Sequence, residues 1–266
     1  MRYAINCSLL FKEYPLLERA AAAKAAGFDL VEFWWPWDEP VPPDGEVRDF
    51  VEAIRASGTQ LIGLNFFAGT MPGPDRGVVS WVARQDEFRA NVPVTLAIGA
   101  ELGCRAFNAL YGNRQPDEDA GRSAEVALAN YAFAAEQAAA IGGVVLVEPV
   151  SGPGSEAYPL KLAADCFAVI DRLEADGVTN VKFLADLYHL AVNGDDVAGV
   201  VRQHAGRVGH VQVADFPGRG EPGTGSLPLT ELLVGLRVGG YDGAVALEYN
   251  PTVRTAESFM KLPDLS

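Results

Sequence analysis

The chain has 266 residues, of which 49% are hydrophobic, so it carries enough apolar material for one large core. Its 21 Lys and Arg residues against 35 Asp and Glu residues give a formal net charge of −14, which argues against nucleic acid as a partner because an acidic surface repels phosphate backbones. No uninterrupted apolar stretch reaches the ~18 residues of a membrane helix, so we expect no membrane insertion.

The N-terminus has an apolar run that Asn6 and Lys12 interrupt, which is typical of a first strand rather than of a signal peptide. The three cysteines, Cys7, Cys104 and Cys166, are far apart and form no Cys-x-x-Cys pair. We therefore expect three buried thiols that act as small apolar side chains, no disulfides, and a reducing cytoplasmic location.

Short apolar runs alternate along the chain with Ala-, Leu- and Glu-rich stretches of helical spacing. Several runs are apolar on both faces, as in parallel strands covered by helices. The alternation, without a linker, predicts one α/β domain over residues 1–266, a single (β/α)8 TIM barrel. We predict strands near 3–9, 30–35, 60–66, 105–111, 144–150, 181–188, 208–215 and 243–250, and helices at 16–26, 86–102, 125–140, 160–176 and 227–236.

Two long loops rich in Gly and Pro, 68–77 and 216–226, follow the third and seventh predicted strands. TIM barrels place their active sites on the loops at this end of the strands. Arg219 and Glu221 lie among glycines that permit close backbone approach, so these loops are predicted to cover a substrate; a plain surface loop is the alternative.

Four polar residues lie at the ends of predicted strands: Glu148, Asp186, Gln212 and Glu248. They are separated by 38, 26 and 36 residues, close to the roughly 30 residues of one unit of a barrel, so consecutive strands would direct them to one point. Three buried carboxylates would repel one another, and a divalent cation would relieve that repulsion. The all-oxygen donor set predicts Mg²⁺ or Mn²⁺.

Further polar residues surround this predicted site. His189, expected at the strand end or in the next loop, is predicted to polarise a substrate oxygen, with a structural role as the alternative. His210 is expected deeper in the barrel in a supporting role. Glu32 and Asn6 lie inside early strands and are predicted to be structural, and the aromatic segment 33–37 would wall the pocket or lie at a subunit interface.

At these positions the chain resembles the hydroxypyruvate isomerase family of the xylose isomerase-like barrel superfamily, over nearly its whole length. The most specific motif is Arg-Gly-Glu-Pro-Gly-Thr-Gly at 219–225 together with His-Val-Gln at 210–212. Val-Glu-Pro at 147–149, Asp-Leu-Tyr-His at 186–189 and Leu-Glu-Tyr-Asn-Pro at 247–251 support it.

The resemblance implies an isomerase that converts hydroxypyruvate to tartronate semialdehyde through an enediolate. It implies a divalent metal bound by Glu148, Asp186, Gln212 and Glu248, with Glu148 and Glu248 also serving as the acid/base pair. The substrate, a small hydroxy keto acid or sugar, would contact His189, Arg219, Glu221 and Asn65.

Several alternatives stay open. A 2-oxo-tetronate isomerase would use the same chemistry on a four-carbon acid. Ketose 3-epimerases of the superfamily usually have histidine where Gln212 stands, and its apurinic-site endonucleases need several histidines, whereas this chain has three. A non-catalytic sugar-binding barrel and a homo-oligomer are also open. Two departures from the family, Asn113-Arg114 after Gly112 and Asn-Phe-Phe-Ala-Gly at 65–69, bear on the substrate.

Overall fold

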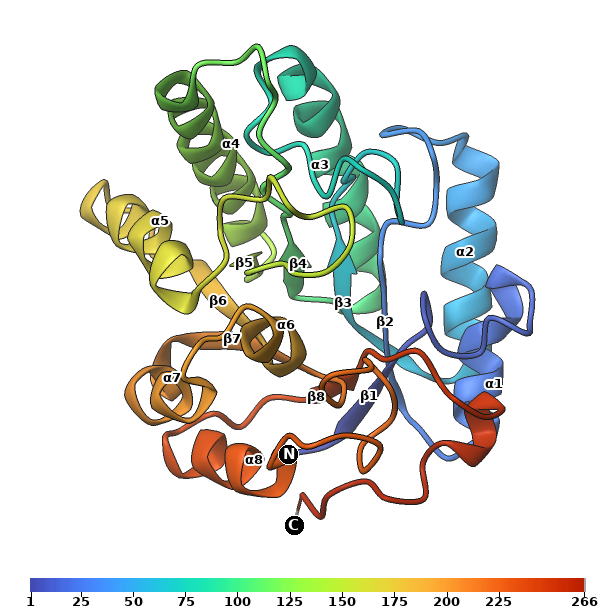
Figure 1. Cartoon of the computed structure of the whole chain (residues 1–266). Helices are drawn as coiled ribbons and strands as arrows, with labels where there is room; N and C mark the ends of the chain where they lie inside the picture. Colours follow the sequence, from blue (N-terminus) through green and yellow to red (C-terminus); the bar gives the residue numbers. More distant parts are fainter. Residues whose placement is uncertain (266) are drawn as a thin grey trace.

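In the computed structural model, which describes residues 1–265, eight strands close into one barrel in sequence order (Figure 1). All neighbouring pairs are parallel, and β1 pairs with β8 to close the sheet. This confirms the predicted (β/α)8 barrel. The strands are β1 (Tyr3–Asn6), β2 (Leu30–Phe33), β3 (Gln60–Asn65), β4 (Ala106–Asn108), β5 (Val144–Val147), β6 (Val181–Asp186), β7 (Val208–Val213) and β8 (Val245–Leu247).

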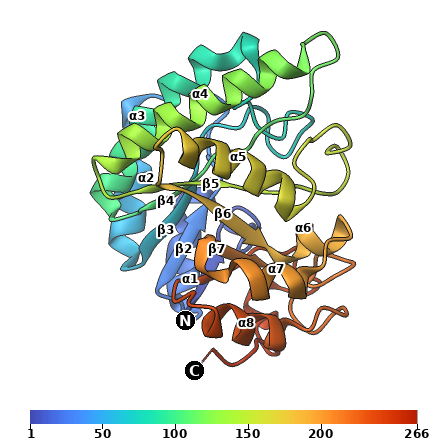
Figure 2. The same ribbon diagram turned by 90° about the vertical axis from the view of Figure 1, so that its left-hand side faces the viewer.

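The α-helices are α1 (Arg19–Ala25), α2 (Asp44–Ser57), α3 (Gln85–Leu102), α4 (Ala120–Ala139), α5 (Ala163–Ala175), α6 (Leu187–Val192), α7 (Val197–His204) and α8 (Leu229–Val238). They surround the barrel, and Figure 2 shows α4, α5, α7 and α8 one after another on the outside of the strands. Short 3-10 turns occur at Leu16–Glu18, Val82–Arg84, Ala205–Arg207 and Thr255–Glu257.

The strands begin within two residues of their predicted starts but end earlier than predicted. The clearest correction concerns the predicted strand 181–188, which stops at Asp186 because that carboxylate caps α6. Its Oδ1 accepts the backbone N–H groups of Tyr188 at 2.8 Å and His189 at 3.1 Å. His189 therefore lies in the first turn of a helix, not on a strand or in a loop, and the cap fixes both residues relative to each other.

Two tryptophans of the aromatic segment 33–37 belong to the core between the barrel and α2. The rings of Trp35 and Trp37 pack edge to face at 4.8 Å, and Trp37 packs against Phe50 of α2 at 5.3 Å. Trp35 and Trp37 therefore pack on the side of α2, and the predicted subunit interface stays a prediction. The three cysteines are buried and free, as expected.

The two ends of the chain lie side by side in both views (Figures 1 and 2). The Tyr3 hydroxyl on β1 donates a hydrogen bond of 2.9 Å to the carbonyl of Pro263, which ties the C-terminal segment to the first strand. Among residues 1–265, no helix combines the length and the apolar character required to span a bilayer.

Candidate active site

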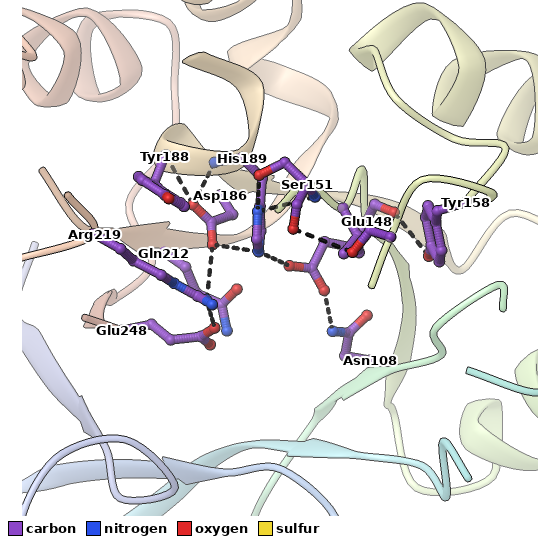
Figure 3. A network of polar contacts seen from close by, with 12 residues as sticks. Asn108, Glu148, Ser151, Tyr158, Asp186, Tyr188, His189, Gln212, Arg219 and Glu248 are labelled. Atoms are coloured by element: carbon purple, nitrogen blue, oxygen red, sulfur yellow. Dashed lines mark hydrogen bonds and ion pairs between the residues drawn. The ribbon is translucent and has the colours of Figure 1, made fainter. Parts of the chain in front are cut away.

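The four predicted ligand residues converge at the carboxyl end of the barrel (Figure 3). Asp186 is the last residue of β6 and Gln212 the second-last of β7, and the two are paired across the sheet. Glu148 and Glu248 directly follow β5 and β8. All four are buried. Because parallel strands aim their carboxyl ends at the same mouth, residues from separate units share one small volume.

Glu148, Asp186 and His189 lie close together, with one possible ligand atom of each within 4.8 Å of the others. His189 Nε2 lies 3.5 Å from Asp186 Oδ2 and 3.9 Å from Glu148 Oε1. The backbone N–H of Ser151 donates to His189 Nδ1 at 3.1 Å, so the ring proton is on Nε2. Burial and nearby cations, Arg219 first, hold the pKa of His189 well below its usual value. The imidazole is therefore neutral and points its N–H at the carboxylates.

Arg219 closes the other side of the site. Its Nη2 lies 2.5 Å from Glu248 Oε1 and 3.9 Å from Asp186 Oδ2. The residue has a left-handed backbone conformation (φ 56°), and its carbonyl accepts the N–H of Asn250 at 2.7 Å. This hydrogen bond holds the backbone of Arg219 against the segment after β8.

The site carboxyl groups resist ionisation in the protein alone. Burial, followed by repulsion from Asp186, raises the pKa of Glu148 to about 8. Burial also raises the pKa of Asp186 to about 6, although Arg219 opposes the shift. The pKa of Glu248 is raised well above its usual value by burial and by Asp186 and Glu148, again against the effect of Arg219. Shifts of this kind are typical of functional sites.

Two buried oxygen atoms test whether these residues fit a cation. Asp186 Oδ2 and Gln212 Oε1 have no hydrogen-bond partner among the described residues. A buried acceptor without a donor costs free energy, and a hard divalent cation at the carboxylate cluster would satisfy both oxygens. The residues present therefore fit a divalent cation.

Asn65 and Glu221, the other predicted substrate contacts, occupy different places. Asn65 ends β3 and lines a void of about 10 Å³ inside the barrel, which Asn108 and Gln212 also border. Both carboxylate oxygens of Glu221 engage Thr252, accepting from its N–H at 2.9 Å and its hydroxyl at 2.6 Å. Glu221 thus anchors its loop to the segment after β8, and none of the described contacts joins it to the carboxylate cluster.

The loop 216–226 is also tied down by Asp215. This carboxylate accepts the backbone N–H groups of Phe216, Gly223 and Leu227 at 2.8–3.0 Å. A side chain at Gly225 would collide with the carbonyl oxygen of Phe216, so glycine is required for this close approach. The glycines of the sequence motif therefore shape a compact loop that presents Arg219.

Sequence reasoning did not predict two residues that contact the site, Asn108 and Ser151, and it predicted Trp34 only as part of the aromatic segment 33–37. Asn108 Nδ2 donates to Glu148 Oε2 at 2.6 Å, and Ser151 Oγ lies 2.6 Å from His189 Nδ1. Trp34 Nε1 donates to Glu248 Oε2 at 3.4 Å, so this member of the aromatic segment reaches the pocket. Asn108 ends β4, and the strand-end argument applied to the ligands would have found it.

Asn113, one of the departures from the family pattern, links two loops. Its amide nitrogen donates to the carbonyl of Gly154 at 2.7 Å and to that of Pro74. The loop after β3 is thereby joined to the loop after β5, which carries Ser151. Asn113 thus shapes the rim of the site, and none of these contacts involves Glu148, Asp186 or Glu248.

Comparison with known families agrees with this geometry. The model of the family described as "Xylose isomerase-like TIM barrel" matches residues 20–263. The chain belongs to this family. Within it, the similarity to hydroxypyruvate isomerases that the motifs indicate is confirmed by the first relative described next.

A Streptomyces coelicolor protein named "Putative hydroxypyruvate isomerase" is 52% identical, over 98% of this chain and 95% of that protein. The 2-oxo-tetronate isomerase of Cupriavidus necator is 31% identical, over 96% and 95% of the two chains. Among solved structures, one titled "AP endonuclease, family 2" from Brucella melitensis is 30% identical and superposes with a TM-score of 0.87, over 97% of this chain and 96% of that one.

Proposed function

We propose that the protein is a metal-dependent isomerase of small hydroxy keto acids, with hydroxypyruvate to tartronate semialdehyde as its reaction. The observation that carries the proposal is the pair of buried glutamates, Glu148 and Glu248, which follow β5 and β8 at the mouth of the barrel on two sides of Asp186 (Figure 3). A proton transfer between adjacent carbons needs acid/base groups placed beside both carbons, and two carboxyl groups at one mouth can take these positions.

Glu148, Asp186, Gln212 and Glu248 would hold the divalent ion. When bound, the ion supplies Lewis-acid polarisation of neighbouring substrate oxygens, which acidifies the C–H bond between them. The unpartnered oxygens of Asp186 and Gln212 support this ligand set. Mg²⁺ and Mn²⁺ are the ions that an oxygen-rich set favours.

The reaction itself is a proton transfer by the two glutamates. One carboxylate removes a proton from C3 of hydroxypyruvate to give an enediolate, and a proton is delivered to C2 while the hydroxyl proton moves from the oxygen on C3 to that on C2. His189 presents its Nε2–H beside Glu148 and Asp186 and so donates to a substrate oxygen. Arg219 carries the positive charge that a substrate carboxylate requires.

The similar proteins support this substrate class. Relatives at 52% and 28% identity are named as hydroxypyruvate isomerases, the former as putative, and one at 31% as a 2-oxo-tetronate isomerase. The four-carbon acid is therefore the second candidate. Solved ketose 3-epimerases at 19–20% identity share the fold, while Gln212 favours the keto-acid branch.

Turnover in D₂O tests the proposal. The protein is stripped with chelator, Mn²⁺ or Mg²⁺ is added back, and hydroxypyruvate and 2-oxo-tetronate are followed separately by NMR. We expect metal-dependent isomerisation with deuterium entering at carbon, and the faster substrate identifies the branch. Failure to convert either acid with metal bound would overturn the proposal and favour another ketose substrate or a binding protein.

A further inference from the structure

Beneath the proposed metal ligands lies a second buried carboxylate, that of Glu32 in β2. Its Oε1 accepts hydrogen bonds of 2.8 Å from Asn6 Nδ2 and from Gln212 Nε2, and its Oε2 lies 2.5 Å from His210 Nε2. A Cβ at Gly63, on the neighbouring strand β3, would lie 3.0 Å from Oε2 and 3.2 Å from Cβ of Glu32. The barrel interior is thus shaped to admit this side chain, and three donors satisfy it.

Glu32 decides which way the amide of Gln212 faces. A side-chain amide has a donor end and an acceptor end of nearly equal size, so shape alone does not orient it. An ionised carboxylate only accepts hydrogen bonds, so Nε2 must face Glu32 and Oε1 must face the mouth of the barrel. Oε1 of Gln212 is, like Oδ2 of Asp186, a buried oxygen without a hydrogen-bond partner among the described residues.

Glu32 also reaches a second proposed ligand through Asn6. The Nδ2 group of Asn6 lies between Glu32 Oε1 at 2.8 Å and Glu248 Oε2 at 2.7 Å. One oxygen of Glu248 is thereby held within the barrel while the other remains on the side of Arg219. A single carboxylate thus contacts one proposed ligand residue, Gln212, directly and a second, Glu248, through Asn6.

The hydrogen bonds around Glu32 are consistent with this orientation. Asn6 Nδ2 and Gln212 Nε2 both donate to Oε1, and His210 Nε2 lies 2.5 Å from Oε2. Because two amide N–H groups share Oε1 as their acceptor, the nitrogen of the Gln212 amide, and not its oxygen, faces Glu32.

We propose that Glu32 is a positioning residue, which orients the Gln212 amide and, through Asn6, the Glu248 carboxylate for metal binding. The inference rests on the ligand set of the proposed function. Contacts that orient ligands typically change metal affinity by about 10–100-fold when removed.

A double-mutant cycle read out by Mn²⁺ affinity tests this role. Calorimetric titration of chelator-stripped protein compares the wild type, Glu32→Gln, Gln212→Glu and the double variant. We expect Glu32→Gln alone to weaken Mn²⁺ binding by about tenfold or more. In the Gln212→Glu background, the same change should leave binding unchanged or strengthen it, because an amide at position 32 can donate to a carboxylate at position 212.

A merely structural role would give a different result. In that case Glu32→Gln would lower the melting temperature of the chelated protein. It would also weaken Mn²⁺ binding by the same factor whether position 212 is Gln or Glu, and such equal factors would overturn the inference. If the wild type itself binds no Mn²⁺, the proposed function fails instead. Should Glu32→Gln not fold, Asn6→Ala carries the test: we expect severalfold weaker binding, and an unchanged affinity would overturn the inference.

Discussion

Among residues 1–265, two buried glutamate–histidine pairs in the barrel show opposite pKa shifts of the glutamate. Within the barrel, His210 Nε2 lies 2.5 Å from Glu32, and the pKa of this glutamate is lowered. At the mouth, His189 Nε2 lies 3.9 Å from Glu148, and the pKa of this glutamate is raised to about 8. Glu32 is 3% exposed and Glu148 4%, so burial does not account for the difference.

The difference lies in the donors around each carboxylate. Glu32 receives three, whereas Glu148 receives one strong hydrogen bond, from Asn108, and faces the carboxylate of Asp186. Hydrogen bonds and opposite charges favour the ionised form, while a like charge disfavours it. The carboxylate of the inner pair, Glu32 with His210, has its hydrogen-bond donors within the protein. The carboxylate of the outer pair, Glu148 with His189, has one strong donor and a neighbouring carboxylate, and the charge of Arg219 offsets this repulsion only in part.

Removing the outer carboxylate should have the largest effect. Glu148→Gln keeps the shape of the side chain but removes the proton-transfer group, so we expect kcat to fall by about a thousandfold while the fold persists. Steady-state kinetics and circular dichroism measure the two properties. Glu156→Gln, at an exposed position in the same loop, is the matched control and should keep its activity. Turnover near that of the wild type in Glu148→Gln would remove Glu148 from the mechanism.

Arg219 supplies positive charge to the outer site, and its geometry can be tested separately from its charge. Arg219→Lys keeps the charge but loses the planar fork that binds a carboxylate through two hydrogen bonds. We expect KM for the keto acid to rise by about 10–100-fold, in line with the roughly 1.5–3 kcal/mol of a hydrogen bond to a charged group. The exposed Arg202→Lys on α7 is the control. A KM within twofold of the wild type would exclude direct carboxylate recognition by Arg219.

The opposite pKa shifts predict opposite effects of pH on stability. For Glu148 the folded-state pKa is raised from 4.5 to about 8, so the chelated protein should lose stability as pH rises through this window. The slope should reach about 1.4 kcal/mol per pH unit for this one group. For Glu32 the folded-state pKa is lowered, so its carboxylate stabilises the fold at pH values above its pKa in the unfolded chain. This stabilisation is lost as the pH falls into the acid range. Urea unfolding of chelated wild type and Glu148→Gln measures the slope, and identical slopes would refute the assignment to Glu148.

The raised pKa of Glu148 also predicts that metal binding releases protons. At pH 7 most Glu148 side chains should be protonated in the chelated protein, and a bound cation requires the carboxylate. We expect roughly one proton released per Mn²⁺ from this residue, measured by calorimetry in buffers of different ionisation enthalpy. The release should fall by about that amount in Glu148→Gln. A binding heat independent of the buffer would contradict the prediction.

The smallest effect is expected at Glu221, whose carboxylate binds Thr252. Glu221→Gln should lower stability by about 1 kcal/mol and change KM by less than about threefold, because the amide keeps one acceptor for the loop contact. Denaturant unfolding and steady-state kinetics measure both. A KM increase above tenfold with unchanged stability would instead support the direct substrate contact that the family resemblance implies.

Much of the architecture could be predicted from the sequence because it depends on periodicity. Apolar strands at regular intervals predict a parallel barrel, and the strand ends of such a barrel meet at one mouth. The convergence of Glu148, Asp186, Gln212 and Glu248 follows from this rule, since each lies at or directly after the end of a strand. The short helix after Asp186 was not foreseen, because the cap that starts it depends on the orientation of one side chain.

Only the tertiary structure decided how these side chains are oriented and charged. Glu32 has an inconspicuous place inside a strand, and its partners Gln212 and Asn6 lie 180 and 26 residues away along the chain. Asn6 meets Glu248 across 242 residues. Hydrogen-bond polarity and pKa are set by such contacts, not by local pattern, because they depend on which donors and charges the folded chain brings within a few ångströms. The sequence alone therefore predicted that Glu148, Asp186, Gln212 and Glu248 meet at one end of the barrel, and the fold decided that the Glu32 carboxylate has three donors while that of Glu148 has one strong donor.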